Sequence, residues 1–448
     1  MANVSGVSPK SVSAADRWPG GMMWMVVLLL LPVAFLNYLD RQMMAVMKTS
    51  IMHDLPSIGV QENWGLLLGS FKWVYAALSP VGGYVADRFS RRYIIGISLF
   101  IWSAVTWMTA YVTTFNELLT TRALMGISEA CYIPAALALI ADFHSRRTRS
   151  RAVGLHQTAI YAALMLGGFT GYAADSPDIG WRMVFMFAGI VGVLYAFPLL
   201  FLLRDAPIAV QLPLEKVSAA ATGEEARETA GDARTHADQH LSVTATSQRG
   251  ILELLRNPSF WLLVVYFTLP AIAGWVVKDW MPEILKRRFD LGQGAAGVSA
   301  TLYVNLAALI GAVLGGVLAD RAMRRSVRGR IHVSALGMLL IVPALFGIGY
   351  AGSLLSAVLF LMLFGLGWGF FDGNNMPILS QIARPELRAT GYGIMNFVSI
   401  SCGGFADWIY GICQDRGLGD QVFFGVVAGA TLFSAVLVLL IRPRPELQ

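Results

Sequence analysis

The chain has 448 residues, of which 56% are hydrophobic and only 14% charged, and its formal net charge is +6. Soluble domains carry roughly 25% charged residues, so this composition excludes an ordinary soluble protein. The positive charge does not indicate nucleic-acid binding, because the arginines lie in short segments between apolar blocks, as topology signals do. The three cysteines lie in apolar segments without metal-ligand spacing, so we expect no metal site.

Twelve apolar blocks follow one another along the chain, each long enough to cross a hydrocarbon core of roughly 30 Å. The first block follows a segment without the features of a cleaved signal peptide, so we interpret it as a retained span. The predicted spans are 22–47, 63–87, 93–113, 117–141, 151–175, 181–203, 258–283, 296–320, 331–351, 354–380, 388–413 and 419–441. They predict an all-α membrane protein with twelve transmembrane helices.

The blocks divide the chain into two halves of six spans. We predict an N-terminal tail at 1–21, an N-terminal bundle at 22–203, a linker at 204–257, a C-terminal bundle at 258–441 and a tail at 442–448. The linker is polar and has no apolar period, which is typical of a largely disordered segment. It contains His236 and His240, and a metal-binding tract there is a less favoured alternative.

The distribution of basic residues predicts the orientation in the membrane. One set of loops holds most of the arginines, namely Arg88, Arg91, Arg92, Arg146, Arg147, Arg149, Arg151, Arg321, Arg324, Arg325, Arg328, Arg330, Arg384, Arg388, Arg442 and Arg444. The opposite set holds only Lys48, Arg182, Lys286, Arg287, Arg288 and Arg416. Basic loops stay in the cytoplasm, so we expect both termini and the linker to be cytoplasmic, in a bacterial inner membrane.

Two sequence motifs recur at nearly one offset. Gly-Tyr-Val-Ala-Asp-Arg-Phe-Ser-Arg-Arg at 83–92 closes the second span, and Gly-Val-Leu-Ala-Asp-Arg-Ala-Met-Arg-Arg at 316–325 closes the eighth. Arg-Ala-Val-Gly at 151–154 has its echo in Arg-Ala-Thr-Gly at 388–391. These repeats predict two pseudo-symmetric six-helix bundles with a site between them near the middle of the membrane.

The first repeated motif has a physical logic. Its glycine permits close helix packing, and its aspartate at a helix end can pair with arginines or with a neighbouring helix N-terminus. Such a pair would latch one conformation, whereas anchoring by positive charge alone would leave the aspartate unexplained. The predicted latch residues are Gly83, Asp87, Arg88, Arg92, Asp320 and Arg321.

This motif resembles the signature loop of the major facilitator superfamily, with Ser90 in place of the usual glycine. The resemblance covers nearly the whole chain and implies a transporter of two related six-helix bundles. A phosphate-binding P-loop is not expected, because no Gly-Lys pair occurs in the sequence. We therefore expect an ion or solute gradient to drive transport, with no cofactor and no enzymatic activity.

Five charged residues lie well inside the predicted spans of the N-terminal half, where charge is costly and usually functional. Asp40 and Arg41 lie in the first span, Lys72 in the second, and Arg122 and Glu129 in the fourth. With both carboxylates ionised, the three cations leave a surplus of one positive charge, which would attract an anion. Protonating a carboxylate would free its arginine for the anion and couple the two binding events. The alternative is that these residues form structural pairs, and that Lys72 extends its amine towards the interface.

The surroundings of these charges resemble the anion:cation symporter branch, which includes galactonate and other sugar-acid transporters and sialin. The similar segments are Asn-Tyr-Leu-Asp-Arg of the first span, Arg-x-x-x-Gly-x-x-Glu-Ala of the fourth, and Gly-Trp-Arg at 180–182. The resemblance assigns Arg41 and Arg122 to the substrate anion. It assigns Asp40 and Glu129 to protons.

The same charges also resemble the Spinster-type transporters of lysolipids and sphingolipids, which share an Ile-Ala-Asp run like that at 140–142. Pro134 favours the symporter branch. The leading hypothesis is therefore a proton-coupled symporter of a small organic anion. A transporter of amphiphilic anions and a proton-driven efflux antiporter are the alternatives, and a non-transporting receptor or scaffold is disfavoured because it would gain little from the buried charges.

Polar residues elsewhere in the spans are candidates to complete the substrate site, although each also suits a hydrogen bond between helices. With Lys72, the candidates that we favour are Tyr75, Gln157, Tyr161, Asn375 and Asn396. Lys278 and Asp372 are further polar residues of the C-terminal spans. We interpret Asp279 as an echo of Asp40, paired with Lys278 or solvated. The expected partners are the anion, protons and the lipid bilayer, with no nucleic acid, and the expected state is a monomer.

Overall fold

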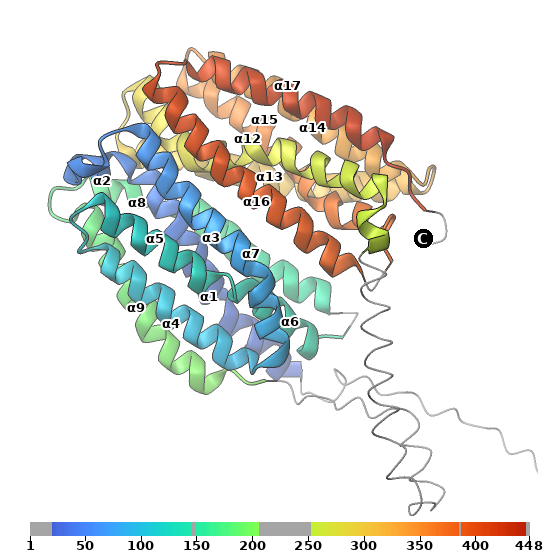
Figure 1. Ribbon diagram of the computed structural model, residues 1–448, viewed down its shortest axis with the longest axis horizontal. Coiled ribbons are helices and arrows are strands. Elements are labelled where there is room, and N and C mark those ends of the chain that lie inside the picture. The colour runs from blue at the N-terminus through green and yellow to red at the C-terminus, as the bar shows by residue number, and fades with distance from the viewer. Residues whose placement is uncertain (1–19, 146–147, 206–251, 385–386, 445–448) are drawn as a thin grey trace, which may run out of the picture.

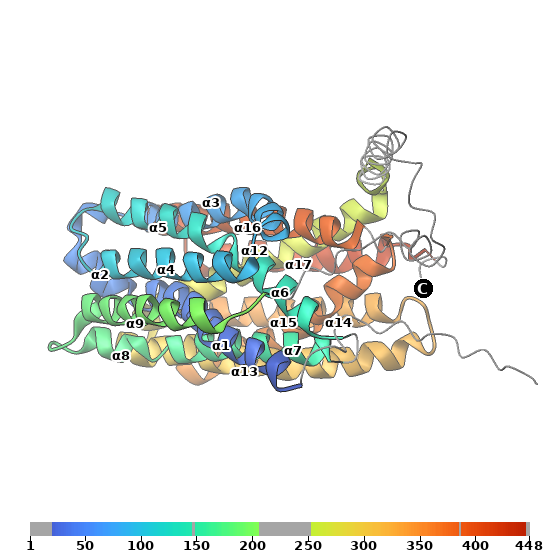
Figure 2. The same cartoon turned by 90° about the horizontal axis from the view of Figure 1, so that it is seen from below.

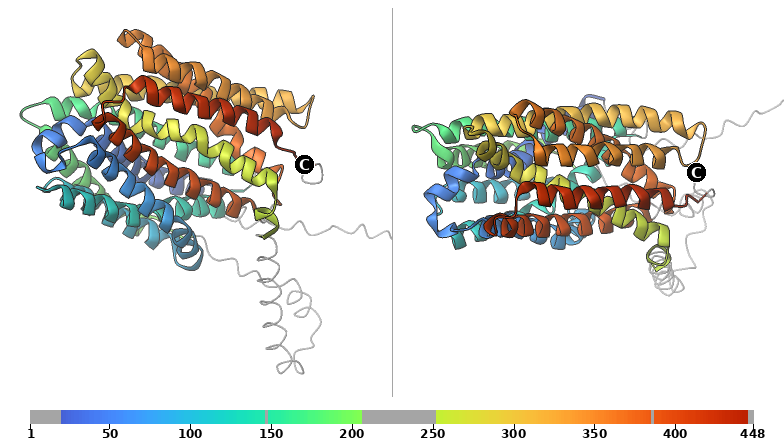
Figure 3. Two further views of the ribbon diagram at one scale, coloured as in Figure 1. Left: turned by 45° about the horizontal axis from the view of Figure 1, so that its top comes forward. Right: turned by 90° about the horizontal axis from the view of Figure 1, so that it is seen from above.

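The computed structural model describes residues 20–145, 148–205, 252–384 and 387–444, without the side chain of Asp87. Its long helices run roughly along one direction, as Figures 1 and 2 show. The N-terminal half lies on one side in Figure 1 and the C-terminal half, from yellow to red, on the other. Two further views show the same division into halves (Figure 3).

The helices of the N-terminal half are α1 (Gly20–Val46), α2 (Lys48–Asp54), α3 (Gln61–Arg88), α4 (Arg91–Thr109), α5 (Phe115–Glu129), α6 (Tyr132–Phe143), α7 (Arg149–Gly167), α8 (Thr170–Asp175) and α9 (Gly180–Leu202), with a 3₁₀ turn η2 (Pro56–Ile58). Those of the C-terminal half are α12 (Pro258–Phe289), α13 (Gln293–Met323), α14 (Gly329–Tyr350), α15 (Leu354–Ser380), α16 (Arg388–Asp415) and α17 (Asp420–Leu440).

These helices supply the twelve predicted crossings when α5 with α6, and α7 with α8, are counted as single spans. Nine spans within the described residues are long and apolar enough to cross a membrane on length and composition alone. The remaining three are α3, α4 and α16. Helices satisfy all backbone hydrogen bonds internally, as a chain in hydrocarbon requires.

Two of the spans predicted as continuous are in fact interrupted. The span predicted at 117–141 breaks between α5 and α6, directly after Glu129. Gly82 of α3 faces this break, and a Cβ atom at Gly82 would lie 2.5 Å from the carbonyl oxygen of Ala130. The span predicted at 151–175 breaks in the same way at residues 168–169. Both apolar blocks continue past these breaks, so the pattern of spans does not predict the interruptions.

The predicted linker lies mostly outside the described residues, as do His236, His240 and most of the two tails. Its last part is described, and residues 252–255 form a helical turn. Leu254 of this turn is buried in the core. The helix α12 begins at Pro258, and the short turn before it packs on the C-terminal half.

The two halves are joined at one end of the molecule. We call the end with Arg88, Arg324 and Arg388 the arginine-rich end, and the other, with α2 and α8, the arginine-poor end. Among the described residues, every hydrogen bond and ion pair between the halves lies from the membrane middle to the arginine-poor end. In Figure 1, α3 and α16 lie together near the arginine-poor end and separate towards the other.

Glycines permit the close approach at the arginine-poor end. A Cβ at Gly69 of α3 would lie 2.8 Å from the carbonyl oxygen of Gly404 on α16. A Cβ at Gly168, after α7, would lie 2.8 Å from the carbonyl oxygen of Gly297 on α13. We call these contacts the α3–α16 seam and the α7–α13 seam. Small residues at such seams allow the backbones to approach closely.

Candidate functional site

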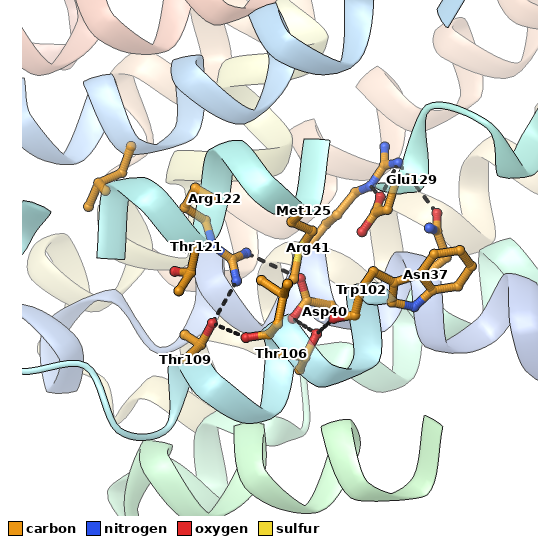
Figure 4. Close-up of polar contacts among 12 residues, drawn as sticks. Asn37, Asp40, Arg41, Trp102, Thr106, Thr109, Thr121, Arg122, Met125 and Glu129 are labelled. Carbon is orange, nitrogen blue, oxygen red and sulfur yellow. Dashed lines mark hydrogen bonds and ion pairs between the residues drawn. The ribbon is translucent and has the colours of Figure 1, made fainter. Parts of the chain in front are cut away.

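Arg122 of α5 and Asp40 of α1 form an ion pair in the core of the N-terminal half. Arg122 Nη1 lies 3.1 Å from Asp40 Oδ2, and the two side chains are 4% and 3% exposed. Thr106 of α4 donates a hydrogen bond to Asp40 Oδ1 at 3.3 Å, and Arg122 Nη2 donates to Thr109 Oγ1 at 3.4 Å (Figure 4). Each charge therefore has hydrogen-bonding partners on two other helices, as a buried ion needs, although Arg122 Nε has none among the described residues.

Arg41 of α1 and Glu129 of α5 form a second ion pair. Arg41 donates from Nε at 3.0 Å and from Nη2 at 2.6 Å, both to Glu129 Oε2. Arg41 Nη2 also donates to the Asn37 side-chain oxygen at 3.3 Å (Figure 4). Glu129 is fully buried whereas Arg41 is 18% exposed. Glu129 Oε1 is buried without a hydrogen-bond partner in the described part of the chain.

Three aromatic rings surround the Arg41 guanidinium. Its Cζ atom lies 4.9 Å from the ring centroid of Tyr38, 4.8 Å from that of Phe71 and 5.0 Å from that of Tyr75. Such cation–π contacts stabilise a guanidinium where it has lost water. They also hold its remaining N–H groups in a fixed direction beside the cavity that Arg41 lines.

Lys72 of α3 forms ion pairs with two carboxylates of the other half, Asp279 of α12 and Asp407 of α16. Its ammonium also lies 4.5 Å from the centroid of the Trp275 ring. Lys72 is buried, so the alternative in which its amine extends to the interface is wrong. The expectation for Asp279 is corrected as well, since its ion pair is with Lys72 rather than Lys278.

Asp407 was missed in the sequence. It lies in α16, eight residues before the end of that helix, and is fully buried. An aspartate inside an apolar helix is the same signal that marked Asp40 and Glu129, so the composition of α16 could have revealed it.

A cavity between the halves gathers these charges. It is lined by Arg41, Lys72 and Arg122 of the N-terminal half, and by Lys278 and Asp279 of α12. Its apolar lining consists of Met44, Leu67, Leu68, Phe71, Leu164 and Trp275, and its other lining residues are Tyr38 and Gln42.

Lys278 differs from the other cations of the cavity. In the described part of the chain no carboxylate lies within ion-pair distance of its amine, which is 5.2 Å from the centroid of the Trp275 ring. Asp372 of α15 is its electrostatic neighbour and is exposed.

Counting the C-terminal half changes the charge of the site. Lys278, Asp279, Asp372 and Asp407 add one cation and three carboxylates to the five charges of the N-terminal half. The surplus of one positive charge therefore becomes a surplus of one negative charge when every carboxylate is ionised. An anion can gain net attraction here only when carboxylates are protonated.

The other residues predicted for the substrate site have different surroundings. Tyr75 lies against Arg41, Gln157 of α7 is exposed, and Tyr161 is half-buried. Asn375 of α15 is buried, and both polar atoms of its amide are without a hydrogen-bond partner among the described residues. Asn396 of α16 is half-buried.

In the N-terminal half, the two predicted latch arginines contact residues of that same half. Arg88 donates to the hydroxyl of Tyr84 at 3.2 Å, and Arg92 Nε donates to the carbonyl oxygen of Leu200 at 2.5 Å. A Cβ at Gly83 would meet no atom within 4 Å. The side chain of Asp87 lies outside the described part of the structure.

The C-terminal copy of the motif behaves alike. Asp320 pairs with Arg330 at 2.7 Å, within the same half. Arg321 is exposed and forms no ion pair with a described residue. In this conformation the described residues of the motif do not join the halves.

Within the described ranges, no cluster of three His, Cys, Asp or Glu side chains has the arrangement of a metal site.

Comparisons with known proteins place this architecture in a family. Residues 30–406 match the profile of the Major Facilitator Superfamily. An "MFS-type efflux pump" of Mycolicibacterium smegmatis is 28% identical over 95% of this chain and 91% of its own. A probable galactarate/D-glucarate transporter of Escherichia coli is 25% identical over 86% of both chains. The inward-facing, unoccupied structure of a bacterial homologue of the lysosomal transporter Spinster has a TM-score of 0.70, with 21% identity over 95% of both chains.

Proposed function

The chain belongs to the Major Facilitator Superfamily, as a multi-pass membrane transporter and not an enzyme, and we propose that it is a proton-coupled symporter of a small organic anion. A sugar acid or another carboxylate is the proposed substrate, carried by alternating access. The observation that supports this most is Arg41, a partly exposed guanidinium at the cavity whose counterion is the fully buried Glu129.

In the proposed cycle, a proton and the anion replace each other as partners of one arginine. Protonation of Glu129 removes the charge that holds Arg41, and the guanidinium then binds a substrate carboxylate through its forked N–H groups. Because each binding event favours the other, the affinities for proton and anion rise together. Asp40 plays the corresponding part for Arg122, deeper in the bundle.

The proposed substrate site extends over both halves. Arg41, Tyr75, Gln157 and Tyr161 contribute from the N-terminal half. Lys278 adds a cation from α12, and since it lacks a carboxylate partner in the described structure it can bind an anionic group directly. The hydroxyls of a sugar acid suit the amides of Asn375 and Asn396 on the opposite side. Lys72 contributes to the charge of the cavity, but its two carboxylate partners oppose direct anion binding.

We place the protein as a monomer in a bacterial inner membrane with its arginine-rich end in the cytoplasm. The structure then corresponds to a state closed to the outside, because the contacts between the halves lie at the arginine-poor end. In this assignment the repeated motif forms its latch contacts in the opposite, outward-open state. The proton gradient is the proposed driving force, without a cofactor.

A second candidate is transport of an amphiphilic anion. The observation in its favour is the apolar part of the cavity, where Met44, Leu67, Leu68 and Phe71 lie beside Arg41 and suit an acyl chain. The mycobacterial relative is named an efflux pump, which raises export as the direction, so the direction of transport is tested together with the substrate.

Two measurements test the proposal. In the first, a thermal-shift screen offers sugar acids, monocarboxylates, dicarboxylates and lysolipids to the purified protein at acidic and neutral pH. We expect a small carboxylate to raise the melting temperature more at acidic pH, and Arg41→Ala to lose that shift. Stabilisation by long-chain anions alone would select the second candidate.

In the second, proteoliposomes are supplied with that carboxylate. Wild-type protein is expected to take up protons when substrate is added, whereas Glu129→Gln loses the proton uptake but still exchanges labelled for unlabelled substrate. Thr120→Ala, a change at an exposed neutral residue of the same helix as Glu129, serves as the control for general damage and retains proton uptake. Substrate-driven proton uptake that persists in Glu129→Gln would contradict the assignment of the proton to this carboxylate.

A further inference from the structure

Lys72, Asp279 and Asp407 form a charged bridge between the two halves, and neither the comparisons nor the proposed coupling gives it a role. Lys72 belongs to α3 of one half, and both carboxylates belong to the other, on α12 and α16. Trp73, the next residue along α3, donates a hydrogen bond to the carbonyl oxygen of Ser401 on α16 at 3.1 Å. The bridge therefore lies in the α3–α16 seam that closes the arginine-poor end.

The bridge has an unbalanced charge. One ammonium serves two carboxylates, which leaves one negative charge in a buried place. Lys72 and Asp407 are 5% and 0% exposed, and Asp279 is 15% exposed. Asp407 Oδ1 is buried without a hydrogen-bond partner among the described residues. An unpaired charge so far from water is costly, and neutralisation by a proton is the usual response.

Neighbouring charges do not remove this imbalance. Lys278 precedes Asp279 on α12 and would offset one carboxylate, but Lys278 also has Asp372 of α15 as an electrostatic neighbour. Together Lys278 and Asp372 add no net charge, so the bridge and its neighbours keep one surplus negative charge. Arg41 and Arg122, which line the same cavity from α1 and α5, have Glu129 and Asp40 as counterions.

We propose that the Asp279–Asp407 pair binds one proton when the arginine-poor end closes and releases it when that end opens. The proton joins a carboxylate oxygen, with Asp407 as its principal site, and the closed bridge becomes neutral. When the seam separates, Lys72 leaves both carboxylates and water reaches them, so that both ionise and the proton returns to water. Closure of this end is thereby favoured by acidity, independently of Glu129 and of the substrate. The inference depends on alternating access in the proposed function, but not on the identity of the anion.

Another titratable group between the halves responds in the opposite direction. Lys48 of α2 lies 4.3 Å from the centroid of the Trp280 ring on α12, and burial lowers the pKa of Lys48 to about 8. The closed end disfavours the charged form of Lys48. Raising the pH from about 8 towards the ordinary pKa of lysine therefore favours closure. The Asp279–Asp407 pair makes a higher pH favour opening, so the sign of the pH response distinguishes the two groups.

The test measures the opening of the arginine-poor end without substrate. Cysteines replace Val60 and Leu418, which are exposed at this end on opposite halves, in a chain whose Cys131, Cys402 and Cys413 are replaced by alanine. Spin labels at the two positions report their distance by pulsed electron paramagnetic resonance, from mildly acidic to mildly alkaline pH. In the wild-type background we expect the long-distance population to grow with pH, by at most about tenfold in population ratio per pH unit for one proton.

The expected result for Asp407→Asn is a closed end at every pH, because asparagine mimics the protonated carboxyl. Asp279→Asn leaves Asp407 as the one carboxylate on Lys72, so this variant is also expected to stay closed at every pH. It provides a second variant should Asp407→Asn fail to fold. Asp415→Asn is the matched control. Asp415 also joins the halves, accepting hydrogen bonds from the backbone N–H groups of Gln61 and Glu62 at 2.9 and 2.7 Å, but it is exposed, so the pH response remains.

Two results would overturn the inference. One is a wild-type distance distribution that does not change with pH, or that shifts towards closure as the pH rises. The other is a full pH response in folded Asp407→Asn. Failure of the proposed function would show as a loss of substrate-driven proton uptake in the wild-type protein. The label distance is measured without substrate, so that failure would not affect it. A pH response that survives in Glu129→Gln would confirm that the two proton sites are separate.

Discussion

The two buried arginines of the N-terminal half have different surroundings, although each has one carboxylate partner. Arg41 is partly exposed at the cavity between three aromatic rings, and its counterion Glu129 has one oxygen without a partner among the described residues. Arg122 is almost fully buried, with Asp40 and Thr109 as partners. In the proposed function, Arg41 is therefore the group that a substrate would reach first, and the Arg122–Asp40 pair lies deeper in the bundle.

The stabilising part of the Arg122–Asp40 pair can be separated from its part in transport. We expect Asp40→Asn to lower the stability by about 3–5 kcal/mol, because removal of one partner leaves the other charge buried and uncompensated. The double variant Asp40→Asn/Arg122→Gln removes both charges and recovers most of that loss, whereas transport stays lost. Thermal unfolding of the purified proteins measures the first effect and proteoliposome uptake the second.

A surface ion pair of the same chain is the matched control. Asp54 and Arg182 are 2.7 Å apart, and 46% and 34% exposed. Such pairs contribute about 0–1 kcal/mol, so Asp54→Asn is expected to change the melting temperature little. A double variant as unstable as Asp40→Asn alone would show that the pair does more than balance charge.

Much of the site could be predicted from single residues, and its pairings could not. Charge inside an apolar span marked Asp40, Arg41, Lys72 and Glu129 as candidates, because such charge is rare without a role. Which cation meets which carboxylate depends on helices far apart in the chain, as with Lys72. The net charge of the site could not be predicted either, because it depends on Lys278 and three carboxylates of the C-terminal half.

Among the secondary-structure elements, α3, α7, α13 and α16 carry glycines at both ends, with opposite surroundings. At the arginine-poor end Gly65 and Gly69 of α3 pack against α16. At the arginine-rich end a Cβ at Gly83 of α3, or at Gly393 of α16, would meet no atom within 4 Å. Gly154 of α7 and Gly316 of α13 are likewise open at the arginine-rich end, whereas Gly297 of α13 packs against Gly168 at the arginine-poor end. We infer that the arginine-rich glycines form a seam in the other conformation.

Substitution of one glycine at each end should shift the conformation in opposite directions. A Cβ at Gly65 would lie 2.8 Å from the Cα atom of Trp408, a backbone atom that cannot move aside. Gly65→Leu is therefore expected to open the arginine-poor end. Gly83→Leu fits the present conformation and blocks closure of the arginine-rich end, so it increases the population described here. The distance between labels at Val60 and Leu418 reports both shifts.

Gly429 of α17 provides the control for the glycine substitutions. It is exposed, and a Cβ there would meet no atom within 4 Å, so Gly429→Leu leaves both the label distance and transport unchanged. Transport is lost in both seam variants, because each conformation is needed in every cycle. A closed label distance in folded Gly65→Leu would show that the seam tolerates a side chain and that glycine is not required for closure.

Helix positions followed from the sequence more closely than helix continuity did. The apolar blocks located all twelve crossings, because a span must bury about 20 apolar residues. The interruptions after Glu129 and at residues 168–169 depend instead on contact with α3 and α13, where Gly82 and Gly297 face them. A local pattern carries no information about such contacts.

For the whole molecule, the repeats predicted two related bundles, and the Major Facilitator Superfamily match and the Spinster-homologue structure confirm that fold. The sequence could not predict which end of the molecule is closed, because one chain must encode both conformations. The side of the membrane on which the arginine-poor end lies decides whether this conformation is open to the inside or to the outside. Sidedness therefore connects the conformation described here to the direction of transport.

The sidedness can be measured with one cysteine at each end of the molecule. In a chain without its native cysteines, Leu418→Cys lies at the arginine-poor end and Ser326→Cys at the arginine-rich end, and both positions are exposed. Basic loops resist translocation, so a membrane-impermeant maleimide applied to intact cells is expected to label Leu418→Cys and not Ser326→Cys. After permeabilisation both are labelled, which controls for reactivity. Labelling of Ser326→Cys alone in intact cells would reverse the assignment, and the structure would then be open to the outside.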